Sequence, residues 1–175
     1  YESLLQNIGK NDSVDIFAMQ RTFTSSVGSI LKYFKAFLDF TPHYFKKYEV
    51  LHLHFFYPLI LLVYLYKMIY PKTKVIVTFH GSDITAHING GLNQKIFRFL
   101  SKCVDVPIAV GEDLANEITN KLELKVKEII SAGVNQDVFK PLRLNKKYDF
   151  IFVGSFIKRK GLDLLLKAIE IIEDK

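Results

Sequence analysis

The residues best suited to chemistry form a short polar segment, His80-Gly81-Ser82-Asp83, directly after an apolar run. An imidazole near neutral pH can donate or accept a hydrogen bond to a ligand hydroxyl. Gly81 has no Cβ and lets a ligand approach the backbone closely, while Ser82 or Asp83 could cap a following helical turn. The alternative is a loop histidine satisfied by neighbouring backbone, and position alone favours neither interpretation.

A second group of candidates, Lys158-Arg159-Lys160-Gly161, stands immediately before a predicted helix. Helix N-termini present free backbone N–H groups and partial positive charge, so they bind phosphate groups. Basic side chains beside such an end strengthen the prediction of a phosphate site, and an ordinary solvated basic turn is the alternative. The sequence contains neither a phosphate loop ending in Gly-Lys-Ser/Thr nor a Gly-x-Gly-x-x-Gly fingerprint.

Two further histidines, His52 and His54, alternate on one predicted strand and therefore share a face. No cysteine or carboxylate at a suitable spacing joins them, so we expect no metal site and predict that they pack near the sheet edge. Cys103 is the single cysteine. It excludes an internal disulfide framework, favours a reducing compartment, and is predicted to be a small buried apolar residue.

The elements that must position these residues alternate between short apolar runs and longer helical segments. This pattern predicts an α/β fold with a doubly wound parallel sheet. Strands are predicted over 14–18, 49–54, 74–79, 104–110, 128–130 and 148–153, and helices from Ser26 or Ser29 to Pro42 and over 57–68, 92–102, 112–121 and 162–172. Ligands of such sheets bind at the carboxyl ends of the strands. That rule selects His54, 80–83, Gly111, 132–135 and 154–161.

The domain organisation follows from the loss of periodicity over 133–147. Residues 1–138 are predicted to form an N-terminal Rossmann-like domain, 139–147 a linker, and 148–175 the beginning of a second Rossmann-like domain. We expect both domains to be incomplete, because the first lacks an opening strand and one strand with one helix cannot form the second. The apolar region 50–70 is interrupted by Pro58 and Lys67 and is too broken to span a membrane.

The composition permits a real core, with 49% hydrophobic and 24% charged residues and a formal net charge of +6. The basic residues are scattered, without a dense stripe or a recognisable nucleic-acid module. We therefore expect no nucleic-acid partner.

Taken together, four segments resemble glycosyltransferase family 4 and its relatives of the GT-B architecture, from about Val50 to the end of the chain. Each is weak alone, but they occur in the family's order. They are the histidine-terminated strand Val50–His54, the Thr-x-His-Gly-x-Asp segment ending Thr78-Phe79-His80-Gly81-Ser82-Asp83, the crossover Ser131-Ala132-Gly133-Val134-Asn135 with Phe139 and Pro141, and the donor-domain start Phe152-Val153-Gly154-Ser155 through Lys160-Gly161-Leu162-Asp163-Leu164-Leu165.

The resemblance implies two Rossmann-like domains facing each other across a cleft. It also implies transfer of a hexose or related sugar from a nucleotide-sugar donor to a glycan or lipid-linked acceptor, with retention and without a required metal. His80 would be the catalytic-site residue beside the donor sugar, and His54 would lie on the acceptor side. Lys160, and in many relatives an arginine earlier in its loop, would stabilise the departing diphosphate. The expected donor-binding residues are Gly81, Asp83, Gly133, Asn135, Gly154, Ser155, Lys158, Arg159 and Lys160.

Some positions depart from the family pattern. Ser155 stands where relatives often have arginine, which would leave neutralisation of the phosphates to Lys158, Arg159 and Lys160. Ala132 replaces the usual asparagine, Asn135 the usual aspartate and Gly111 a common serine. The family's paired-glutamate segment would lie beyond Lys175, so we expect this chain to be inactive alone. A sugar-nucleotide epimerase of the same architecture and a non-catalytic remnant of the fold are the alternatives.

The resemblance also carries expectations about location. Aromatic and basic residues between Tyr33 and Lys47 could form a membrane-facing surface, as in relatives with lipid acceptors. A buried helix with a solvated lysine edge is the alternative. We expect a cytoplasmic protein with a role in polysaccharide biosynthesis and peripheral contact with the inner face of the cell membrane.

Overall fold

The computed structural model describes residues 13–19, 26–85, 88, 90–131, 133–142 and 145–173. The chain divides into two compact units, Tyr1–Gly133 and Val134–Lys175, and each is described by itself. The domain limits predicted from the sequence, 1–138 and 148–175, stay predictions.

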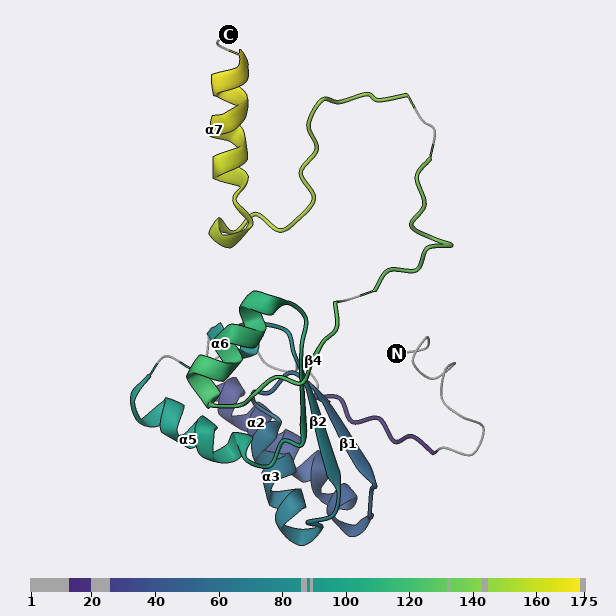
Figure 1. The fold of residues 1–175 in the computed structure, drawn as a ribbon, viewed down its shortest axis with the longest axis vertical. Coiled ribbons are helices and arrows are strands. Elements are labelled where there is room, and N and C mark those ends of the chain that lie inside the picture. The colour runs from purple at the N-terminus through teal and green to yellow at the C-terminus, as the bar shows by residue number, and fades with distance from the viewer. Residues whose placement is uncertain are drawn as a thin grey trace. The chain divides into compact units, whose positions relative to one another are not determined.

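The first unit is built on a parallel sheet of four strands in the order β1-β2-β3-β4 (Figure 1). The strands are β1 (Val50–His54), β2 (Lys74–Phe79), β3 (Val106–Ala109) and β4 (Glu128–Ile129). All three pairings are parallel. The α/β class and the parallel sheet predicted from the sequence are confirmed.

Helices connect the successive strands of the first unit, as parallel pairing requires. The helix α3 (Ile60–Ile69) connects β1 to β2, α4 (Ser82–Thr85) and α5 (Gly91–Ser101) connect β2 to β3, and α6 (Glu112–Leu122) connects β3 to β4. The helix α2 (Ser26–Phe40) and the 3₁₀ helix η1 (Thr41–Phe45) precede β1. The second unit contains the 3₁₀ helix η2 (Lys158–Lys160) and α7 (Leu162–Glu173). The helix α2 ends at Phe40, and η1 then includes Pro42, since proline is tolerated in a first helical turn.

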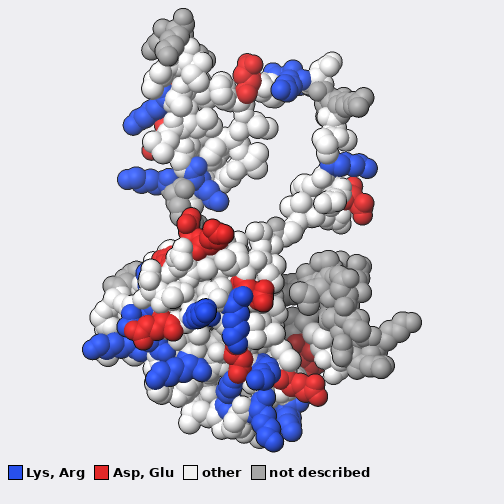
Figure 2. All heavy atoms as spheres, in the orientation of Figure 1, with Lys and Arg blue, Asp and Glu red and all other residues white. Residues whose placement is uncertain are grey.

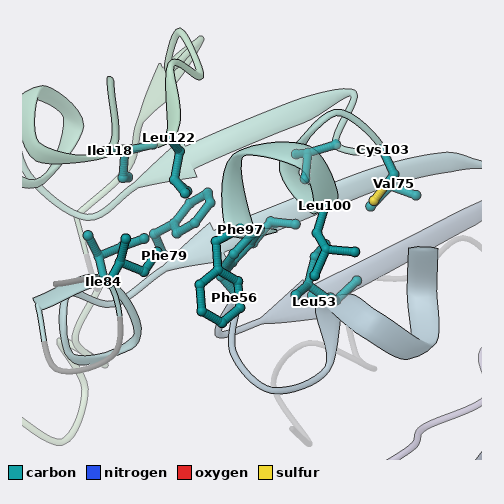
Figure 3. Close-up of a cluster of buried hydrophobic side chains, with 14 of the residues drawn as sticks. Leu53, Phe56, Val75, Phe79, Ile84, Phe97, Leu100, Cys103, Ile118 and Leu122 are labelled. Carbon is teal, nitrogen blue, oxygen red and sulfur yellow. The ribbon is translucent and has the colours of Figure 1, made fainter. Parts of the chain in front are cut away.

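One face of the sheet forms the main core. Val75, Val77 and Phe79 alternate along β2 and are completely buried, whereas Ile76 and Thr78 on the opposite face are only half-buried. Apolar side chains from α3, α5 and α6 pack against the buried face (Figure 3). The labelled members of this cluster are Leu53, Phe56, Val75, Phe79, Ile84, Phe97, Leu100, Cys103, Ile118 and Leu122. Cys103 is buried, as predicted.

A smaller cluster joins α2, η1 and α3 around the completely buried Tyr66. The Tyr66 hydroxyl donates to the Lys46 carbonyl at 2.8 Å and accepts the Tyr48 N–H at 2.8 Å. Phe40 and Leu62 are the other buried members. These contacts fix the segment that leads into β1.

Two strands predicted from the sequence are wrong. Residues 14–18 are extended without strand pairing, and Val14 and Ile16 are 45% and 50% exposed. Residues 148–153 also have no strand pairing, although α7 follows as predicted. Apolar composition alone does not make a strand, because the hydrogen bonds of a strand belong to a neighbouring strand, and neither segment has one among the described residues.

Charged side chains of both signs share the face of the first unit seen in Figure 2, where basic and acidic groups are interspersed. Within the first unit, Lys67 forms an ion pair with Asp105, and Arg98 forms one with Glu123. Of the helices within the described ranges, none is both long and apolar enough to cross a membrane. The apolar stretch after β1 is instead the ten-residue helix α3.

Candidate functional site

The carboxyl ends of the strands meet at one edge of the first unit. The register places His54 beside Thr78, Thr78 beside Ile108, and Ala109 beside Ile129. The segments that leave β1, β2, β3 and β4 therefore start side by side. This edge gathers His54, His80, Gly111 and the start of the 130–133 segment, as the rule for parallel sheets predicts.

His80 follows β2 directly and its side chain is exposed. Its backbone N–H donates to Asp83 Oδ1 at 3.2 Å. Gly81 has a φ of 95°, which favours glycine, and a Cβ built there would meet no atom within 4 Å. The Gly81 carbonyl accepts the N–H groups of Ile84 and Thr85 at 3.0 and 2.9 Å and so begins α4. The backbone after β2 is thus open to solvent on the side where a Gly81 side chain would stand.

Asp83 holds two strand ends together. It is only 2% exposed. Oδ1 accepts the His80 N–H, and Oδ2 accepts the Phe56 N–H at 2.8 Å. Both carboxylate oxygens therefore bind backbone of the segments that follow β1 and β2. Asp83 lies within α4 and accepts N–H groups from two preceding segments, rather than from the turn that follows it as the predicted cap would. Its predicted part in donor binding stays a prediction.

Three imidazoles form a row on the half-open face of the sheet. The ring centroids of His52 and His54 lie 4.6 Å apart, and those of His54 and His80 lie 5.8 Å apart. His52 Nε2 is 2.9 Å from Thr78 Oγ1, and the Phe55 ring lies 4.5 Å from the His80 ring. The two strand histidines share a face, as their alternation predicts.

The surroundings of His52 and His54 lower the pKa of both side chains. Burial lowers the pKa of His52, and the neighbouring His54 lowers it further. Burial also lowers the pKa of His54, with a smaller contribution from His80. Within the described ranges, no three histidine, cysteine or acidic side chains are grouped so that they could hold a metal ion. His52 and His54 are thus suited to hydrogen bonding as neutral imidazoles.

The second unit carries the predicted phosphate-binding residues around the start of α7. Lys158, Arg159 and Lys160 form η2, and the side chains of Lys158 and Lys160 are exposed; the Arg159 side chain lies outside the described atoms. Gly161 has a φ of 69°, and its carbonyl accepts the N–H groups of Leu164 and Leu165 at 3.1 and 3.0 Å. The cations therefore directly precede a helix N-terminus, as the sequence indicates.

The remaining predicted donor-side residues also lie near turns. A Cβ built at Gly154 would be 3.4 Å from the Phe152 ring and 3.9 Å from Lys160 Cγ. Ser155 contributes its carbonyl to the Ile157 N–H at 2.9 Å. The structure brings Gly154 and Ser155 close to the basic turn within their own unit.

The crossover residues make a turn of their own. Asn135 Oδ1 accepts the Asp137 N–H at 2.9 Å, and the Asn135 carbonyl accepts the Phe139 N–H at 2.8 Å. Gly133 is exposed. Ala132 lies outside the described residues. The Asn135 side chain is used locally, and donor binding by Gly133 and Asn135 stays a prediction.

Phe55 and Phe56 were not selected by the sequence reasoning, yet both contact the site. The Phe55 ring lies over His80, and the Phe56 N–H binds Asp83. A signal was present, because two successive phenylalanines at the end of an alternating strand cannot both face the core.

A shallow hollow of about 300 Å³ lies elsewhere, between the carboxyl ends of α5 and α6. Arg98, Lys102 and Glu123 are among the residues that line it. Both helices end just before a strand begins, so the hollow is at the opposite edge from His80. None of the predicted site residues lines it.

Comparison with known proteins shows the family of the chain. Residues 10–138 match the family described as Glycosyltransferase Family 4. An uncharacterized glycosyltransferase of Methanocaldococcus jannaschii, MJ1178, is 31% identical over 99 residues, which are 56% of this chain and 27% of that protein. The chain thus spans about a quarter of the length of this relative. With most of its length matched and an exposed histidine at the end of the second strand, the chain belongs to glycosyltransferase family 4.

Proposed function

We propose that this chain supplies the acceptor-side domain of a retaining, metal-independent glycosyltransferase. The enzyme moves a hexose or related sugar from a nucleotide-sugar donor to a glycan or lipid-linked acceptor. The observation that carries the proposal is the exposed imidazole of His80 at the carboxyl end of β2, in a chain of glycosyltransferase family 4. Family membership favours transfer over the epimerase and the non-catalytic remnant.

The chemistry assigns separate tasks to the two units. His80 hydrogen-bonds a hydroxyl of the donor sugar and positions it, and His54 lies on the acceptor side. Lys158, Arg159 and Lys160, with the N–H groups at the start of α7, stabilise the charge that builds on the departing diphosphate. Gly81, Gly133, Gly154 and Ser155 let the donor approach the backbone. Asp83 contributes by holding the His80 backbone.

The test uses this sequence extended through a complete donor domain, with release of nucleotide from a panel of nucleotide sugars as the measurement. His80→Ala should lower turnover by roughly a hundredfold, the loss typical of one well-placed polar group in a site. His43→Gln is the matched control, because His43 lies in η1, before β1, and its ring contacts Phe40 and Tyr48. Turnover of His80→Ala equal to that of the parent would contradict the proposal.

Metal independence has its own test. Turnover should be unchanged after treatment with EDTA and dialysis, since the phosphate charge is met by lysine and arginine side chains. Restoration of a lost activity by added Mg²⁺ or Mn²⁺ would overturn that part of the proposal.

We also propose peripheral contact of the first unit with anionic membranes, at the inner face of the cell membrane, in keeping with cytoplasmic polysaccharide synthesis on a lipid-linked acceptor. Phe34 of α2 and Phe45 of η1 are 61% and 83% exposed, and the exposed Lys47 follows Phe45 by two residues. Exposed aromatic and cationic side chains together favour a lipid interface. Tyr44 does not contribute, because its hydroxyl donates to the Leu62 carbonyl at 3.0 Å.

Vesicle sedimentation tests this contact. The chain should sediment with vesicles that contain anionic lipid and much less with purely zwitterionic ones. Phe34→Ser with Phe45→Ser should reduce the bound fraction, whereas Leu92→Ser, which removes an equally exposed apolar residue from α5, should not. If the chain sediments with neither kind of vesicle, this part of the proposal is wrong.

A further inference from the structure

Phe55, the first residue after β1, has an unusual backbone conformation. Its φ is 80°, a value that residues with a Cβ rarely adopt. The other non-glycine residue with positive φ in the described ranges is Glu123, which caps the end of α6, where such a conformation is ordinary. Phe55 ends no helix, so the conformation must be imposed by its neighbours.

Two backbone hydrogen bonds, one from the N–H of Phe55 and one from the N–H of Phe56, impose the positive φ. The Phe55 N–H donates to the Thr78 carbonyl at 3.1 Å and prolongs the pairing of β1 with β2. The Phe56 N–H donates to Asp83 Oδ2 at 2.8 Å. Phe56 is completely buried and packs against Phe79, with ring centroids 5.4 Å apart.

The positive φ changes which side chain faces the core. In a regular strand Leu53 and Phe55 would share the buried face, and Phe56 would point away from it. In the structure Leu53 and Phe56 are buried, whereas Phe55 is 43% exposed. The Phe55 ring therefore lies on the same side as the histidine row, 4.5 Å from the His80 ring and tilted 34° to it.

The backbone of His80 is held by the same carboxylate. Asp83 Oδ1 accepts the His80 N–H at 3.2 Å, while Oδ2 holds Phe56. Asp83 is 2% exposed; its bond from the Phe56 N–H is buried and its bond from the His80 N–H is partly buried, which limits competition from water. The carboxylate of Asp83 thus holds the backbone at Phe55–Phe56 at a fixed distance from the backbone at His80.

We infer that Phe55 and Asp83 are positioning residues that hold the His80 imidazole in one orientation at the strand-end edge. Asp83 sets the separation of the two loops, and the Phe55 ring limits the rotation of the His80 side chain. The geometric part of this inference stands on its own, and its consequence for turnover rests on the proposed function. An exposed imidazole without such a contact would sample several rotamers, and small misplacement of a reacting group lowers rates strongly.

The first experiment measures the orientation of His80 without any substrate. Three-bond couplings of the labelled 175-residue chain report the χ1 rotamers of His80. The parent should show one dominant rotamer, and Phe55→Leu should show averaging over at least two. Phe55→Gly should show the same averaging in a folded chain, because glycine adopts the positive φ without strain. Phe45→Leu, which shortens an exposed phenylalanine of η1, should match the parent.

The Asp83 half of the inference is tested by hydrogen exchange of single amides. Asp83→Asn keeps the size of the side chain but replaces one accepting oxygen by an NH₂ group. We expect at least a tenfold faster exchange at the amide of Phe56 or His80, with the amides of β3 unchanged. Unchanged exchange at both amides overturns the role of Asp83.

Turnover separates this inference from the proposed function. In the chain extended through a donor domain, Phe55→Leu should lower kcat by roughly tenfold and change KM for the donor by less than about twofold, since the loss is one of orientation. If Phe55→Leu frees the His80 rotamers while His80→Ala retains full turnover, the positioning stands and the proposed function fails. A single His80 rotamer with parental kcat in both Phe55 variants overturns the positioning role of Phe55.

Discussion

At the scale of single residues, His52 and His54 couple the stability of the fold to pH. His52 and His54 lie on a strand whose neighbours shield them partly from water, and burial lowers the pKa of both side chains. A histidine with a lowered pKa in the folded chain binds its proton more readily once the chain is unfolded. Between the ordinary pKa of about 6.5 and the lower folded values, the unfolded state therefore binds more protons.

The sign of the effect follows. The free energy of unfolding should rise as the pH rises toward 7 and fall as the pH drops below about 6.5. We expect the double variant His52→Gln/His54→Gln to show a flatter dependence between pH 5 and pH 7 in urea unfolding. Both side chains are exposed in part, so the change in slope should be modest. Equal slopes for the parent and the double variant would contradict the assignment.

At the scale of secondary-structure elements, Asp105 joins α3, β2 and the start of β3. Its Oδ2 accepts the Val75 N–H at 2.8 Å and pairs with the Lys67 ammonium, and Lys74 approaches Oδ1 at 3.7 Å. Burial raises the pKa of Asp105, but the hydrogen bonds from Lys67 and Val75 and the charges of Lys67 and Lys74 outweigh it and hold the pKa below its ordinary value. The ionised carboxylate is therefore part of the folded state.

Replacing the Asp105 carboxylate should weaken the contact between α3, β2 and the start of β3. Asp105→Asn should lower the free energy of unfolding by about 1–3 kcal/mol at pH 7, because the half-buried Lys67 loses its anionic partner and keeps the Cys103 carbonyl as an acceptor. The stabilising contribution of a carboxylate with a lowered pKa is lost as the pH falls through its folded pKa, so the difference between parent and variant should shrink below about pH 4. Urea unfolding at both pH values measures it.

The matched control for that variant is Asp39→Asn. Asp39 pairs with Lys35 one helical turn away, and both side chains are nearly half exposed. Such surface pairs contribute about 0.5 kcal/mol or less. Equal losses in the two variants would show that Asp105 is no more than a surface ion pair.

The elements differ in how far their sequences predict them. The periodicity of α5 and α6 and the alternation of β2 are properties of the local sequence, and the structure confirms them. The segments 14–18 and 148–153 have the same apolar composition as strands but remain unpaired. Local composition does not contain the partner strand, and for this reason those two predictions fail.

The candidate site shows the same division between local and distant information. His80 was found because the carboxyl ends of parallel strands meet at one edge. The bond between Asp83 and the Phe56 N–H joins residues 27 positions apart, and the positive φ of Phe55 results from that bond together with the burial of Phe56. Contacts of this kind depend on the assembled fold, so the sequence alone indicated Asp83 only as a local cap.

At the scale of the whole molecule, the buried apolar side chains belong to the first unit. Both core clusters consist of residues between Phe40 and Leu122. In the described part of the second unit, every side chain is exposed or half-buried, and the exposed ones include Phe139, Tyr148, Ile151 and Leu164. Burial of apolar area is the main source of stability, so the first unit should carry nearly all the stability of this chain.

A shortened chain of residues 1–133 tests this distribution. We expect its thermal midpoint to lie within about 3 °C of the parent, less than the shift that a loss of about 1 kcal/mol causes. Limited trypsin digestion of the parent should cut first at the exposed Lys146 or Lys147 and leave a resistant fragment that contains the sheet, since exposed segments without a core are cleaved without global unfolding. A midpoint lowered by 10 °C or more, or early cleavage within α5 or α6, would show that residues beyond Gly133 contribute to the folded core. In that case residues beyond Gly133 would unfold cooperatively with the sheet that carries His80.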